Sequence, residues 1–287
     1  MGCHQNANEA SLDISSKGQT EVISTADSIR ATIKSLPTVR ELGTDREKQA
    51  CTFLVKKLLD YNYNVETQVI EYSLADGGFA IESSEPFPVN LEKIAEGETN
   101  NIVAKHKQYD FSKKDIIIIA HYDTTSFPGA NDNASGVAVL IEIAKNVNNL
   151  KDYNLVFVLF SGEENWLLGS QYFVNNLSDA ERENIAAVIN LDTLSGDAEP
   201  EIAFASHKYT AAYYMFENVF KNKLNVNLSP AYSTGDEIPF DSAGIPSMSI
   251  GQKGENLHTD QDILENLDMN DLVTVYNVLS TALKTME

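Results

Sequence analysis

Segment 120–136 brings together two kinds of side chain that bind metals. His121 directly follows 115–120, a β-branched run typical of a strand buried on both faces of a parallel sheet. Asp132 follows a break at Pro128 and Gly129, and apolar residues at helical spacing come after it. Because open α/β sheets bind ligands at the carboxyl ends of their strands, we expect His121 and Asp132 at the active edge.

Asp123 lies two residues after His121, at the same strand end. A carboxylate in this position can hold the second ring nitrogen of a metal-binding imidazole and so fix its tautomer and orientation. We therefore expect Asp123 to support the ligand rather than to bind the metal. The alternative for a single histidine at a strand end is a hydrogen-bonded structural residue.

The next apolar run, 154–160, is followed closely by Glu163 and Glu164. Adjacent side chains diverge along an extended backbone, so these two carboxylates point in different directions. One of them can bind a metal while its neighbour faces the substrate. An acidic strand end by itself is more often a helix cap or a solvated loop.

Two later segments add to the pattern. The apolar run 185–191 ends at Asp192, and the turn-rich stretch 251–262 carries His258. Three successive strands that each end in a candidate ligand, followed by a histidine in a loop, form an improbable coincidence. The sequence therefore predicts a metal site built from several strand ends.

The motifs resemble those of the co-catalytic dizinc aminopeptidases related to bacterial leucine aminopeptidase and, more distantly, to glutaminyl cyclase. They follow the family's order over residues 100–285: AHYD (120–123), PGANDNASGVA (128–138), FSGEE (160–164), LLGS (167–170), NLD (190–192), GDEIPFDSAGIP (235–246) and LHTDQD (257–262). The resemblance implies a zinc exopeptidase that acts on the amino-terminal bond of peptides. It also implies roles for six residues: Glu163 as general base, Asp132 as a bridge between two zinc ions, His121 with Asp192 on one ion, and Glu164 with His258 on the other.

The residue types agree with these roles. Zinc takes imidazole nitrogen and carboxylate oxygen ligands at about 2.0 to 2.2 Å, and manganese or cobalt are possible substitutes on the same ligands. A bridging carboxylate lets two ions lie about 3.5 to 4 Å apart and share a hydroxide. Glu163 would take the proton from this water and pass it to the leaving amine.

The chain departs from the family pattern at two positions. Trp166 stands where the family usually has a small residue. It either lines the cleft and narrows the pocket for the first substrate residue, or simply packs under the loop, and the sequence leaves both interpretations open. Glu237 stands where relatives often carry His, which leaves substrate contacts there open.

Length and composition favour one large globular domain. The 287 residues suffice for a substantial core, and 43% are hydrophobic. The net charge of -21 argues against nucleic acid or an anionic membrane surface as a partner, because phosphate binding depends on excess Lys and Arg. Peptides remain as the expected partners, and the oligomeric state stays open.

Residues 1–20 are polar, lack apolar periodicity and are expected to form a disordered tether. Cys3 followed by polar residues resembles the mature start of a bacterial lipoprotein, so we expect a lipid anchor through Cys3. The chain would then be extracytoplasmic, either anchored to a membrane or secreted. An incidental cytosolic cysteine is the alternative.

Local patterns predict elements in front of the site motifs. Apolar spacing predicts helices over 20–36 and 45–60, and alternation predicts an edge strand over 65–72. The stretch 73–99 reads as a long irregular insertion. His106 alternates outward at the end of the next strand and is expected at the surface.

The sequence thus predicts a disordered tether over 1–20 and a single α/β domain over 21–287, a three-layer α/β/α sandwich with a mixed, mainly parallel central sheet. Its expected activity is that of a zinc aminopeptidase. The alternatives are a single-zinc acyltransferase like glutaminyl cyclase and an inactive, surface-anchored peptide-binding protein.

Overall fold

The computed structural model describes residues 23–72, 96–147, 150–196, 200–203, 211–221, 223–226, 235–252 and 254–286. The expected tether and most of the expected 73–99 insertion lie outside these residues. No helix in the described part of the chain has the length and apolar character needed to cross a membrane.

Eight strands form one sheet in the order β1-β2-β4-β3-β5-β8-β6-β7. The strands are β1 (Tyr63–Tyr72), β2 (Gly97–His106), β3 (Lys114–His121), β4 (Tyr153–Phe160), β5 (Ile185–Leu191), β6 (Glu201–Ala203), β7 (Asn225–Val226) and β8 (Ser247–Gly251). The central strands β4, β3, β5 and β8 run parallel, whereas β2 pairs antiparallel with β4 and β6 with β8. The expected mixed, mainly parallel sheet is confirmed.

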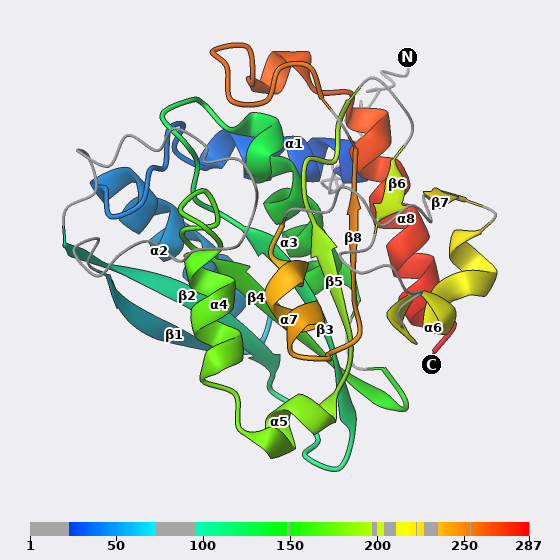
Figure 1. Ribbon diagram of the computed structural model, residues 1–287. Helices are drawn as coiled ribbons and strands as arrows, with labels where there is room; N and C mark the ends of the chain where they lie inside the picture. The colour runs from blue at the N-terminus through cyan, green and yellow to red at the C-terminus, as the bar shows by residue number, and fades with distance from the viewer. Residues whose placement is uncertain are drawn as a thin grey trace, which may run out of the picture.

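Helices cover both faces of this sheet (Figure 1). They are α1 (Thr25–Ser35), α2 (Asp45–Asp60), α3 (Gly136–Asn146), α4 (Leu168–Asn175), α5 (Asp179–Asn184), α6 (Ala211–Phe220), α7 (Glu237–Ser242) and α8 (Met269–Lys284). One apolar core joins the sheet to α1, α2, α3, α6 and α8, and a second core joins its opposite face to α4 and α7. The three-layer arrangement is therefore confirmed.

The central strand β3 illustrates why the sheet is buried on both sides. Ile116 and Ile118 belong to the first core, whereas Ile117 and Ile119 belong to the second. Successive side chains of a strand point to opposite faces, so only an uninterrupted apolar run satisfies both cores. The carboxyl end of this strand is thereby held between two layers.

Two local predictions hold, and two are wrong. The helix predicted over 45–60 is α2, which Thr44 caps by accepting from the backbone N–H of Glu47, and the edge strand predicted over 65–72 lies within β1. His106 is not at the surface: it is buried, and its ring packs edge-on against Tyr63 at 5.4 Å. Residues 97–99 are not irregular either, because β2 begins at Gly97 and pairs with β1 over its full length.

Candidate metal centre

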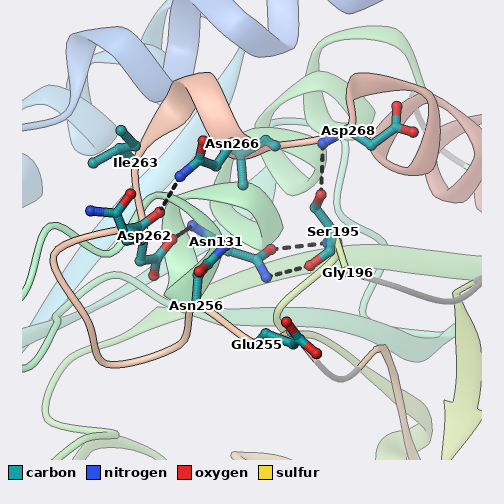
Figure 2. A pocket seen from close by; sticks show the side chains of 12 residues that line it. Asn131, Ser195, Gly196, Glu255, Asn256, Asp262, Ile263, Asn266 and Asp268 are labelled. Atoms are coloured by element: carbon teal, nitrogen blue, oxygen red, sulfur yellow. Dashed lines mark hydrogen bonds between the residues drawn. The ribbon is translucent and has the colours of Figure 1, made fainter.

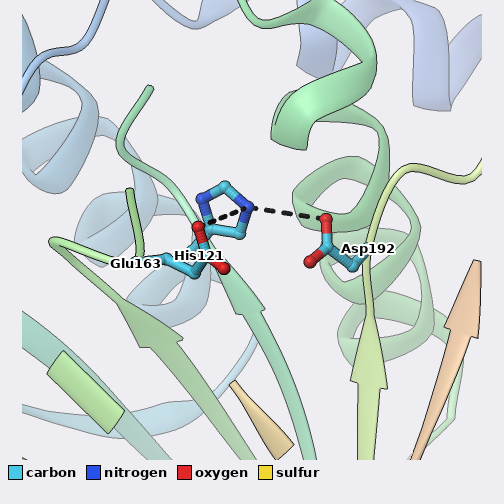
Figure 3. Close-up of side chains that lie close together, drawn as sticks. All are labelled: His121, Glu163 and Asp192. Atoms are coloured by element: carbon cyan, nitrogen blue, oxygen red, sulfur yellow. Dashed lines mark ion pairs between the residues drawn. The ribbon is translucent and has the colours of Figure 1, made fainter. Parts of the chain in front are cut away.

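Three neighbouring parallel strands deliver the predicted side chains to one edge of the sheet. His121 is the last residue of β3, and Asp192 directly follows β5. Glu163 comes three residues after the end of β4. Because β3 lies between β4 and β5, the three side chains meet above it, as Figure 3 shows. The two dashed contacts join His121 Nε2 to Asp192 Oδ1 at 3.5 Å and to Glu163 Oε2 at 3.9 Å.

Asp132 lies between two imidazoles and directs a different oxygen to each. Its Oδ1 atom is 3.1 Å from Nε2 of His121, and its Oδ2 atom is 3.0 Å from Nε2 of His258. Glu164 Oε2 lies 3.2 Å from the same nitrogen of His258. A carboxylate placed in this way suits a bridge between two cations.

The candidate ligands fall into two groups of three. His121, Glu163 and Asp192 offer ligand atoms within 4.8 Å of one another, and so do Asp132, Glu164 and His258. His121 is buried, whereas the side chain of His258 is 52% exposed. The site is thus closed on the sheet side and open to solvent on the side of the loop that carries His258.

Several buried atoms of the site make no hydrogen bond and fit a bound metal. They are both ring nitrogens of His121, Oε1 of Glu164 and Oδ1 of Asp192, and they make no hydrogen bond among the described residues. Buried polar atoms without a hydrogen bond are costly, so such a cluster calls for a ligand. Imidazole nitrogens and carboxylate oxygens are the donors that zinc binds.

The electrostatics of the protein alone agree with this fit. Burial by itself lowers the pKa of His121, but the charges of Glu163 and Asp192 outweigh it and raise this pKa well above its usual value. Contacts with Asp132 and Glu164 raise the pKa of His258 to about 10. Metal ligation requires neutral imidazoles, so a metal that enters the site displaces these protons.

Burial raises the pKa of both Glu163 and Glu164, but only Glu164 has an opposing contact with His258. Burial raises the pKa of Glu163 well above its usual value, and the nearby charges of Asp192 and Glu164 add to this effect against an opposing contribution from His121. A buried carboxyl group whose pKa is shifted by burial and by a specific charged neighbour is a candidate for proton transfer.

Asp123 makes the expected contact with His121 and two further contacts that the sequence did not predict. Its Oδ1 atom lies 3.4 Å from Nδ1 of His121. Its two oxygens also accept hydrogen bonds from the backbone N–H groups of Glu163 at 3.1 Å and Glu164 at 3.3 Å. Asp123 thus fixes the loop after β4 relative to the end of β3.

Asp262 plays a similar part on the other side and was missed from the sequence, although it ends the LHTDQD motif. Its carboxylate accepts hydrogen bonds from the backbone N–H groups of Asn131 at 2.6 Å and Asp132 at 3.1 Å. It lines a small polar cavity of about 80 Å³, where the side chain of Asn131 pairs with the backbone of Ser195 (Figure 2). The position of Asp132 therefore depends on the loop that carries His258.

Asp236 was also not assigned from the sequence. It is fully buried, and burial raises its pKa to about 8. The charge of His121 opposes this shift, whereas the charges of Asp123 and Asp192 add to it. Gly235 lies so close to Asp192 that an added Cβ would come within 3.0 Å of its Oδ2 atom.

Glu237, which stands where relatives often carry His, is buried and accepts a hydrogen bond from Asn190 at 2.9 Å. This side chain therefore has a partner within the protein.

Trp166 belongs to neither core and is 36% exposed. It lies three residues after Glu163 and has a φ of 66°, in the left-handed region that favours glycine. The packing alternative therefore has little support, and the role in a substrate pocket stays a prediction.

Comparisons with known proteins agree with the geometry. Residues 101–283 match Peptidase family M28. Aminopeptidase YwaD of Bacillus subtilis is 27% identical over 226 residues, which make up 72% of this chain and 49% of that protein. Aminopeptidase Y of Saccharomyces cerevisiae is 30% identical over 167 residues, 55% of this chain and 31% of that protein. The chain thus spans half or less of the length of these two relatives.

Solved structures share the fold. BSAP, a zinc aminopeptidase from Bacillus subtilis, superposes with a TM-score of 0.77 at 17% identity over 91% of this chain and 94% of that one. The glutaminyl cyclase of Porphyromonas gingivalis superposes with a TM-score of 0.73 at 24% identity over 93% of this chain and 100% of that one. At these identities the likeness concerns the fold.

Proposed function

Because this chain belongs to Peptidase family M28, we propose that it is a zinc-dependent aminopeptidase that removes amino-terminal residues from peptides. The single observation that carries the proposal is the position of Asp132, which directs one oxygen to His121 and the other to His258. This arrangement supports two metal positions that share a carboxylate. The proposed catalytic domain extends over residues 21–287.

We assign the ligands as the spatial contacts suggest. Asp132 would hold both zinc ions, His121 and Asp192 would complete one set, and Glu164 and His258 would complete the other. Manganese or cobalt would suit the same ligands. When bound, the metals would polarise the scissile carbonyl and lower the pKa of a water molecule.

Glu163 is the proposed general base. Its carboxylate lies 3.9 Å from Nε2 of His121 and could itself reach a metal held by His121 and Asp192, but with Asp132 as the shared ligand each proposed set has three members without Glu163. It takes a proton from the attacking water and then gives it to the leaving amine.

The two alternatives to an aminopeptidase differ from it in what they would do to a peptide. A glutaminyl-cyclase-like enzyme would use one zinc ion and release ammonia from an amino-terminal glutamine, and an inactive protein would bind peptides without changing them. The two groups of candidate ligands, one of which includes Glu163, support the peptidase.

Incubation of zinc-loaded protein with three peptides separates the functions. The peptides are Leu-Ala-Phe, its N-acetylated form and Gln-Ala-Phe, and mass spectrometry identifies the products. An aminopeptidase releases free leucine from the first and leaves the second intact. Formation of a pyroglutamyl peptide alone would favour the cyclase, and three unchanged peptides would favour the binding protein.

We also propose that Cys3 carries a lipid anchor that holds the catalytic domain outside the cytoplasm. The support is the polar composition of the residues that follow Cys3, which suits a tether. Mass spectrometry of membrane-extracted protein tests this: a diacylglyceryl mass on the Cys3 peptide is expected, and an unmodified thiol there would refute it.

A further inference from the structure

Arg40 is a fully buried cation next to the candidate metal centre. It lies in the connection between α1 and α2, outside the residues that match the peptidase family, and only 1% of it is exposed. Burial lowers its pKa to about 10, while the carboxylates of Asp123, Asp132, Asp262 and Glu164 oppose this shift. Arg40 therefore remains charged at neutral pH. The cost of removing this charge from water must be offset by hydrogen bonds or by nearby carboxylates.

All the hydrogen bonds of its side chain go to backbone carbonyls. Nε donates to Tyr122 O at 2.7 Å, and one terminal nitrogen donates to Gly129 O at 2.9 Å. The other terminal nitrogen donates to Pro37 O at 2.8 Å and to Pro128 O at 3.4 Å. The guanidinium thus ties its own segment to both ends of the stretch 122–129.

The backbone of Arg40 joins the same stretch at a third point. Its N–H donates to Thr124 Oγ1 at 2.7 Å, and its carbonyl accepts from the N–H of Thr124 at 3.2 Å. The ties therefore extend along the chain between His121 and Asp132. These are the two residues of that segment that we assign as metal ligands.

The turn before Asp132 needs such support. Gly129 has a φ of 65°, and an added Cβ there would collide with Thr124 and with the carbonyl of Asp132. Arg40 donates to the carbonyls of Gly129 and Pro128, which also accept from the backbone N–H groups of Ala134 at 3.2 Å and Val39 at 3.4 Å, so it adds to the hydrogen bonds that hold this sharp turn. On the other side, Tyr122 O lies between His121 and Asp123 in sequence.

We infer that Arg40 is a positioning residue that holds His121 and Asp132 at the separation needed to bind the metals. The inference rests on the proposed ligands, but it does not depend on peptide hydrolysis. A planar guanidinium is suited to this task because its five donors have a fixed geometry, whereas the ammonium of lysine is a compact charge that cannot reach four carbonyls at once.

Removal of the positive charge of Arg40 and removal of its hydrogen bonds are expected to have opposite effects on metal binding. The positive charge of Arg40 repels an incoming cation, so its removal alone would strengthen binding. Loss of the hydrogen bonds would weaken binding, because residues that orient metal ligands typically contribute about 10- to 100-fold in affinity. Arg40→Lys keeps the charge and removes the planar group, and Arg40→Met removes both.

The test measures the affinity of metal-free protein for Co²⁺ by competition with a chromogenic chelator, with the visible spectrum of bound Co²⁺ as a second readout. We expect Arg40→Lys and Arg40→Met to bind the metal about 10- to 100-fold more weakly and to show an altered Co²⁺ spectrum. Leu283→Ala is the control: it removes a fully buried side chain of α8, so it lowers the melting temperature while wild-type affinity and spectrum remain. If a variant unfolds without metal, the Co²⁺ concentration that refolds it gives the same comparison.

Wild-type affinity and spectrum in Arg40→Lys would overturn the inference, and so would tighter binding by Arg40→Met. An equal loss of affinity in Leu283→Ala would reduce the role of Arg40 to general stability and would overturn it as well. The proposed function fails separately: wild-type protein that binds Co²⁺ normally but hydrolyses no peptide would refute the peptidase and leave the role of Arg40 intact.

Discussion

The carboxylate of Asp123 accepts a hydrogen bond from the backbone N–H of Glu163 at 3.1 Å and so couples the end of β3 to the loop that carries the proposed base. Asp123→Asn removes one of its two acceptor oxygens, and we expect kcat to fall about 10- to 100-fold with a smaller change in KM. Asp110→Asn is the matched control, because exposed Asp110 accepts from the N–H of Ser112 far from the site. Equal kinetics for Asp123→Asn and wild type would remove this coupling from the account.

Glu163→Gln preserves the shape of the side chain and removes its ability to accept a proton. Metal content should stay at the wild-type value, and kcat should fall by about 100-fold or more, since general-base catalysis contributes at least this much. Steady-state kinetics with elemental analysis provide the measurement. Glu183→Gln, an exposed change on α5, should leave both quantities unaltered. A Glu163→Gln enzyme with more than about a tenth of the wild-type kcat would exclude Glu163 as the base.

Asp132→Asn weakens the carboxylate that we place between two cations. We expect fewer than two metal ions per chain and a lower melting temperature in the presence of zinc, because the binding energy of a metal adds to the stability of the folded state. Inductively coupled plasma analysis and calorimetry measure these effects, with exposed Asp152→Asn as control. Two tightly held ions in Asp132→Asn would contradict the bridging role.

Trp166→Gly tests the substrate pocket. Because the side chain is 36% exposed and the backbone has a φ of 66°, the change should leave the melting temperature unchanged or raise it. If the indole limits the pocket, preference shifts toward bulkier amino-terminal residues by about 1 to 3 kcal/mol. Relative kcat/KM values for Ala, Leu and Phe arylamides measure this shift, and Phe111→Gly, which alters a 90% exposed aromatic, is the control. The same selectivity in wild type and Trp166→Gly would count against the pocket role.

Much of the site follows from the sequence because strand ends carry it. The apolar runs before His121 and Asp192 predict buried parallel strands, and the carboxyl ends of such strands meet at one edge. Asp132 lies in the short helical segment Ala130–Ser135 and His258 on a loop, and their proximity followed from the family resemblance rather than from any local pattern.

Other features depend on contacts between distant segments, which no local pattern encodes. Arg40 donates hydrogen bonds to the carbonyls of Tyr122 and Gly129, and Asp262 accepts one from the backbone N–H of Asn131. Alternation placed His106 at the surface, yet packing against Tyr63 buries it. In each case the partner, and not the residue type, determines the outcome.

The most direct test of the account is the rate of leucine arylamide hydrolysis by metal-free protein as zinc is added in known ratios to the chain. Asp132 lies between His121 and His258, so we expect the rate to rise with added zinc and to reach its plateau at two ions per chain. Absence of hydrolysis at every zinc ratio, from protein that is folded and binds the metal, would contradict it.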